Sequence, residues 1–347
     1  MLKIFVEPRA GSASILASNV RGTLHELHSL NTFLLYFSQL ELKELIKFNA
    51  FSQVGNTPLI KLDSKFSGHG ASVWLKVESG NPTGSFKDRM AISVIGNALD
   101  RGELSPNQSV IEYTGGSTGS ALAFACASAG LKFTAIFSDA FSDLKRSTME
   151  TFGAEVLNVP SHGEGITPEL IQRMKIVCAE KVEELGAFYA DQFGSQDVTL
   201  GYEPMGQEIS KQIDGNVDLL CAAVGTGGAF MGTLNGLNKS NIYPKAVALE
   251  PLQSPFLTTG KGGSHKVEGI GVGFYPPFLD AKRINECMSI DQEKAFEMRD
   301  LLASKQGVFC GMSTGLNVVG AIKLARQMSP NENVVTFGCD SGLKYLG

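Results

Sequence analysis

The chain has 347 residues, enough for about two domains, and 43% of them are hydrophobic, which is sufficient for a substantial core. Its net charge of −5 argues against a surface for nucleic acid or anionic membranes. The six cysteines form no CxxC pair and the five histidines form no ligand pattern, so we expect no metal site. Several cysteines have small apolar neighbours, which indicates buried thiols in a reducing cytoplasm.

Residues 1–50 are predicted to be a helical N-terminal extension, with a helix over 29–49 that packs on the main body or on a second subunit. Glu7 and Glu26 are unusual in a transit peptide, and the apolar run 33–37 is too short to cross a bilayer. We therefore expect a cytoplasmic protein without a transmembrane segment.

From residue 54 onward, strand patterns alternate with helical patterns about 10–15 residues long, which predicts an α/β fold with mostly parallel sheets covered on both faces. In the first half we predict strands over 72–77, 109–114, 133–138 and 155–159, and helices over 90–99, 120–129, 141–152 and 168–185. In the second half we predict strands over 219–224, 245–250 and 333–337, helices over 200–213, 291–305 and 316–327, and a glycine-rich loop over 258–273.

Lys87 lies at the centre of Gly80–Ala91 (GNPTGSFKDRMA), between a predicted strand and a predicted helix. Small turn residues precede it and would let a ligand approach its amine. The positive end of the helix dipole lowers the pKa of such an amine, and lysines that form Schiff bases react as neutral amines. Taken alone, the segment favours the alternative of a lysine that simply faces water.

GTGGAFMG (225–232) follows an apolar strand and opens a helix, where free backbone N–H groups can hold a phosphate. No Gly-Lys-Ser/Thr closes it as in a P-loop, and Phe230 occupies the third glycine position of a dinucleotide fingerprint. A single phosphate fits better. The alternative is a tight turn without a ligand.

Two other glycine-rich turns follow predicted strands. The 114–119 turn (TGGSTG) carries hydroxyls that suit a carboxylate, although Thr118 could serve only as a helix cap. The 338–342 turn (GCDSG) places Ser341 at the carboxyl end of the last strand, where open α/β sheets bind ligands, or forms a plain turn. Together with Lys87 and the 225–232 turn, these features describe pyridoxal phosphate with an amino-acid substrate.

The sequence resembles the fold-type II pyridoxal-phosphate enzymes, in the cysteine synthase / cystathionine β-synthase family. The resemblance covers about 54–346, and its pieces occur in family order: VGNTPLIKL, LKVESGNPTGSFKDRMA, EYTGGSTGSALAFACASAG, FGAEV, DQFGSQ, GTGGAFMGT, EGIGVGF, GMSTGLNVVGAI and DSGLKYL.

The resemblance implies a role for each matching residue. Lys87 matches the catalytic lysine that holds the cofactor and moves the α-proton. The implied cofactor-binding residues are Lys87, Ser117, Gly225, Thr226, Gly227, Gly228 and Ser341, with Ser341 facing the pyridine nitrogen. The implied substrate-binding residues are Thr114, Gly115, Thr118 and Gln192. The family turn usually reads TSGNTG, so Gly115 here replaces a serine and Ser117 an asparagine.

The resemblance also implies the fold and the activity. We expect two three-layer α/β domains like those of the tryptophan synthase β chain: a larger one from 51–80 plus 196–347, and a smaller mobile one from 81–195. The expected reaction is β-replacement on L-serine or an O-activated L-serine through an aminoacrylate, with sulfide, a thiol or another small nucleophile, in a homodimer. The alternatives are a β-eliminating lyase that releases pyruvate and ammonia, and a non-catalytic binding scaffold.

Overall fold

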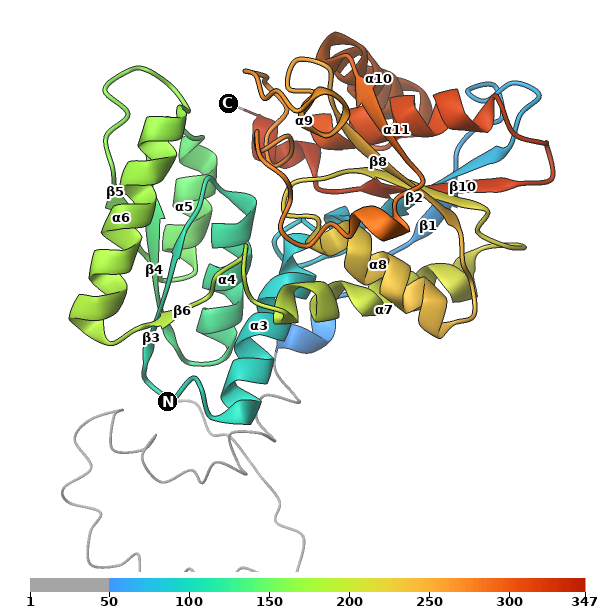
Figure 1. Cartoon of the computed structure of the whole chain (residues 1–347). Helices are drawn as coiled ribbons and strands as arrows, with labels where there is room; N and C mark the ends of the chain where they lie inside the picture. The colour runs from blue at the N-terminus through green and yellow to red at the C-terminus, as the bar shows by residue number, and fades with distance from the viewer. Residues whose placement is uncertain (1–49, 347) are drawn as a thin grey trace, which may run out of the picture. The chain divides into compact units, whose positions relative to one another are not determined.

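The computed structural model describes residues 50–346, and the helix predicted over 29–49 lies outside them. The described chain builds two sheets (Figure 1). A six-stranded sheet has the order β1-β2-β10-β7-β8-β9, and a four-stranded sheet has the order β5-β4-β3-β6. The chain begins the larger sheet, then builds the smaller one, and returns to complete the larger.

The six-stranded sheet is parallel except at one edge, where β1 runs antiparallel to β2 with Ile60 opposite Leu75. Its strands are β1 (Leu59–Lys61), β2 (Ser72–Val77), β7 (Leu219–Ala223), β8 (Lys245–Pro251), β9 (Glu286–Ile290) and β10 (Asn333–Gly338). Its central strand β10 is buried along its whole length, as expected for a strand covered on both faces. The prediction of a mostly parallel α/β fold is confirmed.

The four-stranded sheet is parallel throughout. Its strands are β3 (Ser109–Tyr113), β4 (Lys132–Phe137), β5 (Glu155–Asn158) and β6 (Phe188–Tyr189). The sequence pattern did not predict β6, which has two residues, or β9, an edge strand that is only partly buried. Both strands are held by their neighbours rather than by a local pattern.

The helices cover both sheets, with α3 in contact with both α4 and α7 (Figure 1). Their bounds are α3 (Lys87–Arg101), α4 (Ser117–Ser128), α5 (Asp143–Thr151), α6 (Pro168–Leu185), α7 (Asp197–Gln212), α8 (Gly228–Lys239), α9 (Phe256–Thr259), α10 (Gln292–Gln306) and α11 (Met312–Ala325). Short 3₁₀ turns are η1 (Ala50–Gln53), η2 (Glu78–Gly80), η3 (Ala281–Arg283) and η4 (Gly342–Tyr345).

Helix α6 has the predicted bounds because both of its ends are capped. The Thr167 hydroxyl accepts a hydrogen bond from Leu170 N at 3.1 Å, Pro168 occupies the first turn, and Gly186 adopts φ 56° after the last turn.

Helices α7 and α8 approach closely at Gly236, where an added Cβ would collide with the carbonyl of Glu203. Small residues therefore bring these two helices together on one face of the larger sheet.

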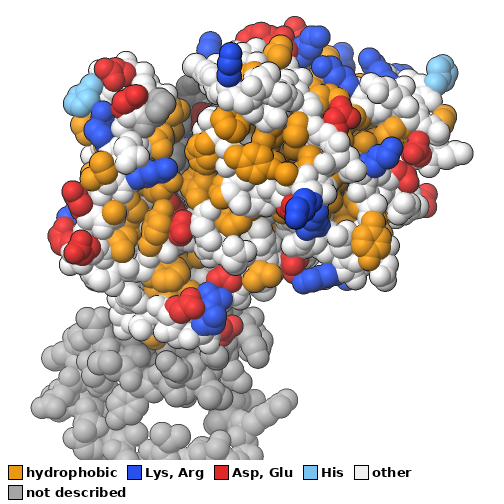
Figure 2. Space-filling model, in the orientation of Figure 1, with side chains coloured by type: hydrophobic (Ala, Val, Ile, Leu, Met, Phe, Trp, Pro, Cys, Tyr) orange, Lys and Arg blue, Asp and Glu red, His pale blue; other side chains and the backbone are white. Residues whose placement is uncertain are grey.

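Among residues 50–346, no helix is long and apolar enough to cross a membrane. On the face shown in Figure 2, acidic and basic side chains are scattered rather than gathered into a single patch.

Candidate active site

Lys87 is the first residue of α3 and follows a turn that begins at Asn81. Its backbone N–H donates to Ser85 Oγ at 3.2 Å, and its amine lies 4.9 Å from the centroid of the Phe86 ring. Burial lowers the pKa of the Lys87 amine, and the nearby Cys339 and Asp340 oppose that effect only in part. More of this amine is neutral at a given pH than in an exposed lysine.

The turn before Lys87 is tied to the end of β10. Phe86 N donates to Cys339 O at 3.0 Å, and Ser341 N donates to Gly84 O at 2.9 Å. Gly84 has φ 72°, a conformation that favours glycine. These bonds bring the 338–342 turn to Lys87, as the sequence analysis required.

A buried ion network anchors the first turn of α3. The Arg89 guanidinium donates to both oxygens of Glu78, with Nε 2.6 Å from Oε2 and Nη2 2.9 Å from Oε1. It also donates to both oxygens of Glu208 at 2.7 and 2.8 Å, and Lys76 Nζ lies 2.6 Å from Glu208 Oε2. Two cations and two carboxylates thus fix the helix that begins at Lys87 against β2 and α7.

The 114–119 loop joins β3 to α4, and its backbone is held by its own side chains. Thr114 Oγ1 accepts from the backbone N–H groups of Gly116 and Gly119, both at 3.1 Å. Thr118 Oγ1 donates to Gln192 Oε1 at 2.8 Å, and Gln192 Nε2 donates to Tyr113 O at 3.2 Å. The structure therefore brings together Thr118 and Gln192, which were predicted as partners 74 residues apart.

Gly115 and Gly116 of this loop face side chains that follow β4. A Cβ added to Gly115 would lie 2.6 Å from Cε1 of Phe141, and one added to Gly116 would collide with the stem of Lys145. Gly116 also has φ 149°. Ser117, predicted to touch the cofactor, is the first residue of α4. Neither Phe141 nor Lys145 was expected at the site from sequence.

Glu112 lies beneath the loop, at the end of β3, and is fully buried. Its Oε2 accepts from Gln192 N at 3.0 Å, whereas Oε1 is one of the few buried polar atoms in the described chain without a partner. Burial raises the pKa of Glu112 to about 8, with Asp191 adding to the effect. At neutral pH this carboxyl is mostly protonated.

The 225–228 loop joins β7 to α8 and is closely packed at each glycine. A Cβ added to Gly225 would collide with the carbonyl oxygen of Gly269. A Cβ added to Gly227 would lie 2.8 Å from the backbone nitrogen of Leu279, and one added to Gly228 would lie 2.5 Å from Cγ1 of Val198. Gly227 has φ 87°, and Gly228 N donates to Thr226 Oγ1 at 3.2 Å. Because α8 begins at Gly228, its first N–H groups have no intrahelical acceptor and suit an anion.

Ser341 lies at the start of η4, where its Oγ accepts from Leu343 N at 3.2 Å. Thr314, in the first turn of α11, offers a second hydroxyl and accepts from Cys339 N at 3.0 Å. Burial raises the pKa of the Cys339 thiol to about 12, while Lys87 opposes that shift. The motif GMSTG contains Thr314, but local sequence does not reveal that it meets the turn beside Lys87.

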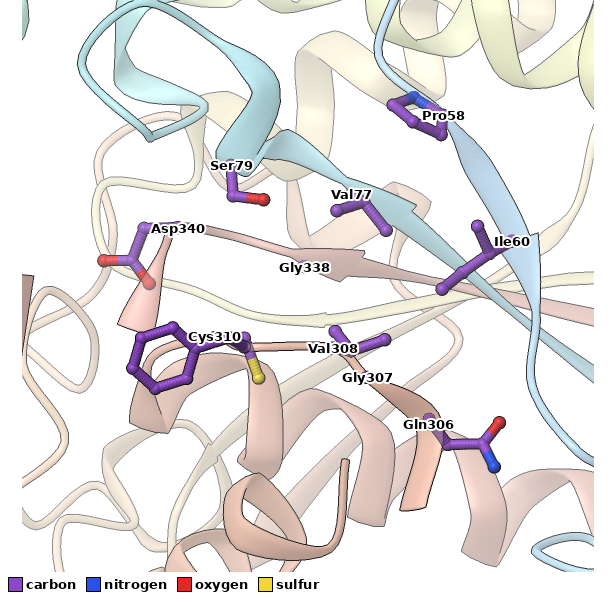
Figure 3. Close-up of a pocket in the computed structure, with 11 residues that line it drawn as sticks. Pro58, Ile60, Val77, Ser79, Gln306, Gly307, Val308, Cys310, Gly338 and Asp340 are labelled. Carbon is purple, nitrogen blue, oxygen red and sulfur yellow. The ribbon is translucent and has the colours of Figure 1, made fainter. Parts of the chain in front are cut away.

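A cavity of about 240 Å³ lies at the ends of β1, β2 and β10, beside the segment before α11 (Figure 3). Its lining combines aliphatic side chains, such as Ile60, Val77 and Val308, with polar ones. It also includes Asp340, but none of the residues predicted for the site. The cavity adjoins the 338–342 turn through Gly338 and Asp340, and its lining includes no residue of the 114–119 or 225–228 loops.

The residues present fit pyridoxal phosphate. Lys87 offers an amine with a lowered pKa that can react with an aldehyde, and the 225–228 loop is a backbone cradle in which a Cβ has no room at three positions. A glycine cradle at a helix start is a typical site for a phosphate group.

Comparisons with known proteins agree with this fit. Residues 50–340 match the family model of the pyridoxal-phosphate dependent enzymes. The chain is 33% identical over 295 residues to cysteine synthase of Staphylococcus aureus, which covers 84% of this chain and 93% of that protein. It is 32% identical over 294 residues to the O-acetylserine dependent cystathionine β-synthase of Bacillus subtilis, covering 84% and 94%.

A crystal structure of cysteine synthase from Entamoeba histolytica resembles the fold with a TM-score of 0.79 at 30% identity, covering 86% of this chain and 89% of that one. The matches span nearly the whole described region. The chain belongs to the family of pyridoxal-phosphate dependent enzymes, in its cysteine synthase branch.

Proposed function

We propose that the protein catalyses β-replacement on an O-activated L-serine, such as O-acetyl-L-serine, with sulfide or a small thiol as nucleophile. The placement of Lys87 carries this proposal: a partly buried amine with a lowered pKa at a strand–turn–helix junction. Relatives named for cysteine synthesis and for O-acetylserine-dependent replacement support the substrate class.

In the proposed reaction, the Cβ–O bond of the substrate breaks and acetate leaves, and a Cβ–S bond forms with the incoming thiolate. When bound at Lys87, pyridoxal phosphate supplies the electron sink that makes the Cα proton acidic. Lys87 Nζ removes this proton and returns it after the thiolate has added. The overall change converts O-acetylserine and a thiol to an S-substituted cysteine and acetate.

The other proposed roles follow the loops. The backbone of Gly225, Gly227 and Gly228 with the Thr226 hydroxyl holds the phosphate, and Ser117 lies at the cofactor ring. Thr114, Gly115, Thr118 and Gln192 hold the substrate carboxylate. Either Ser341 or Thr314 faces the pyridine nitrogen with a neutral hydroxyl.

We further propose that 81–195 forms a smaller domain that closes over the substrate, and that 51–80 with 196–347 forms the larger one. Closure would exclude water and keep the reaction on the replacement path. The proposed setting is a homodimer in the cytoplasm. If closure fails to exclude water, the protein would act as a β-eliminating lyase. The glycine at position 115 favours this outcome because it lacks the hydroxyl of the serine that is usual there.

The test is the visible absorption spectrum of the purified protein with added pyridoxal phosphate. We expect a visible absorption band that is absent in Lys87→Ala and present in Lys245→Ala, which changes an exposed lysine at the start of β8. A colourless wild-type protein would overturn the proposal in favour of a non-catalytic scaffold.

Product analysis then separates replacement from elimination. With O-acetyl-L-serine and a thiol, we expect an S-substituted cysteine and acetate in equal amounts. Pyruvate that forms at the same rate whether or not thiol is present would instead identify a lyase.

A further inference from the structure

We propose that Lys145 is a further substrate-binding residue, whose ammonium takes the α-carboxylate of the amino-acid substrate in exchange for Glu268. The inference rests on the proposed function and adds a cation to a site for which the sequence suggested only neutral donors. It is based on the contact of the Lys145 side chain with the 114–119 loop and on the absence of a charged donor in that loop.

The stem of Lys145 lies against the 114–119 loop. Lys145 belongs to α5, beside the smaller sheet, and its side chain is only 4% exposed. Its Cδ and Cε fill the space that a Cβ on Gly116 would need. Because the stem runs directly along this glycine, the ammonium cannot be far from the loop that is proposed to hold the carboxylate.

The ammonium of Lys145 ends beside the loop that follows α9 and beside η4. It forms an ion pair with Glu268 and lies 5.0 Å from the centroid of the Tyr345 ring. Gly269, which follows Glu268, presses its carbonyl against Gly225 of the 225–228 loop. The hydroxyl of Tyr345 donates to Asp340 at 2.7 Å, in the turn beside Lys87. The amine therefore lies where all the proposed site loops converge.

The side chains of the 114–119 loop carry no charged donor for a carboxylate. Thr118 already donates its hydroxyl to Gln192, and Thr114 Oγ1 is held by two backbone N–H groups. Gly115 has no hydroxyl, and the Phe141 ring leaves no room for one. The first backbone N–H groups of α4 and the Ser117 hydroxyl can donate to a carboxylate here, and the ammonium of Lys145 would add a charged donor, which makes the stronger type of hydrogen bond.

Glu268 is suited to give up its place. It is 33% exposed and precedes Gly269, which has φ 80°, and two further glycines follow at 271 and 273. It can turn into water, whereas the buried ammonium of Lys145 cannot. Breaking the pair without a replacement would leave a buried charge unpaired, but a substrate carboxylate supplies that replacement. Asp340 faces the same region and is already bonded to Tyr345.

The experiment titrates L-serine, and separately L-serinamide, into the pyridoxal-phosphate-loaded protein and follows the visible band to obtain dissociation constants. In Lys145→Met we expect L-serine to bind about tenfold or more weakly, the size of a lost charge-assisted bond. L-serinamide has no carboxylate and should bind wild type and variant alike. Lys145→Arg should recover part of the loss.

Glu268→Gln provides the opposite test because it removes the competing carboxylate and keeps Lys145. L-serine should bind this variant several-fold more tightly than wild type. The matched control is Arg146→Met, which changes the neighbouring residue of α5, paired with Glu150 on its own helix. It should leave both dissociation constants unchanged.

Equal binding of L-serine to wild type and Lys145→Met would overturn the inference while the proposed function stands. The same holds if L-serine and L-serinamide weaken together, or if Glu268→Gln weakens L-serine, because the pair would then be only a bridge between two parts of the fold. If Lys145→Met does not fold, the binding of L-serine to Lys145→Arg and Glu268→Gln still tests the inference. A wild-type protein without a visible band would overturn both proposals.

Discussion

The ring of Phe141 occupies the space that a side chain at Gly115 would need. An added Cβ would lie 2.6, 2.9 and 3.0 Å from three atoms of the ring. The ring is itself held by Phe137, at 5.5 Å between centroids. The Phe141 ring therefore fills the space that a serine would occupy at position 115 of the 114–119 loop.

We expect Gly115→Ser to destabilise the protein by about 1–3 kcal/mol, because it overpacks this contact. In the background of Phe141→Ala the same serine should cost much less, since the space is then free. Urea unfolding of the two single variants and the double variant gives the coupling energy. Effects that simply add would contradict the contact, and recovery of substrate binding in the double variant would support the role of the loop.

Arg89 gives a second prediction. It is 2% exposed and holds two carboxylates, so Arg89→Met should leave Glu78 buried without a cation, while Glu208 keeps only its pair with Lys76. We expect a loss of about 3–5 kcal/mol in the free energy of unfolding, typical of a broken buried ion pair. Arg299→Met is the control because Arg299 pairs with the exposed Asp300, and it should cost less than about 1 kcal/mol. Similar losses in both variants would show that the network is not what anchors α3.

The third prediction compares two hydroxyls. Thr314 accepts a hydrogen bond from the backbone of Cys339, and the carbonyl of Cys339 accepts from Phe86, the residue before Lys87, whereas Ser341 caps η4. We expect Thr314→Val to change the wavelength and the pH dependence of the visible band more than Ser341→Ala does. A larger change of the band in Ser341→Ala would instead indicate that Ser341 faces the pyridine nitrogen, as the sequence analysis predicts.

Local sequence predicted most of the fold. The predicted strands from Ser72 to Phe337 all occur, and β2 and α6 have the predicted bounds, because alternating patterns and capping residues are local signals. Helix α11 begins at Met312, four residues before its predicted start, because Gly315 lets α10 approach closely and the small residues before Leu316 are buried by that contact. No local pattern carries such information.

The site divides in the same way. Lys87 and the glycine-rich turns could be found from sequence because each motif consists of consecutive residues. Lys145 could not be found, since in an amphipathic helix a lysine looks like any solvent-facing charge, and only its contact with Glu268, 123 residues away, reveals its position. Thr314 and Glu112 were missed for the same reason, because their partners lie in other elements.

Glu112 gives the last prediction, which concerns pH. Its pKa is raised from 4.5 to about 8 in the folded protein, chiefly by burial. Between these values the native protein keeps a proton that the unfolded chain has released, so this contribution to stability is complete below about pH 4.5 and declines as pH rises through about 8. Glutamine cannot ionise and imitates the protonated acid. Glu112→Gln should therefore lose less stability than wild type between pH 5 and pH 8.

Urea unfolding of both proteins at pH 5, 6.5 and 8 measures this difference, which should amount to a few kcal/mol at most. Glu164→Gln is the control because Glu164 is exposed, and it should follow the wild-type pH dependence. Parallel curves for wild type and Glu112→Gln would mean that the carboxyl is ionised in the fold. In that case Gln192 would be held by a charge rather than by a neutral acid.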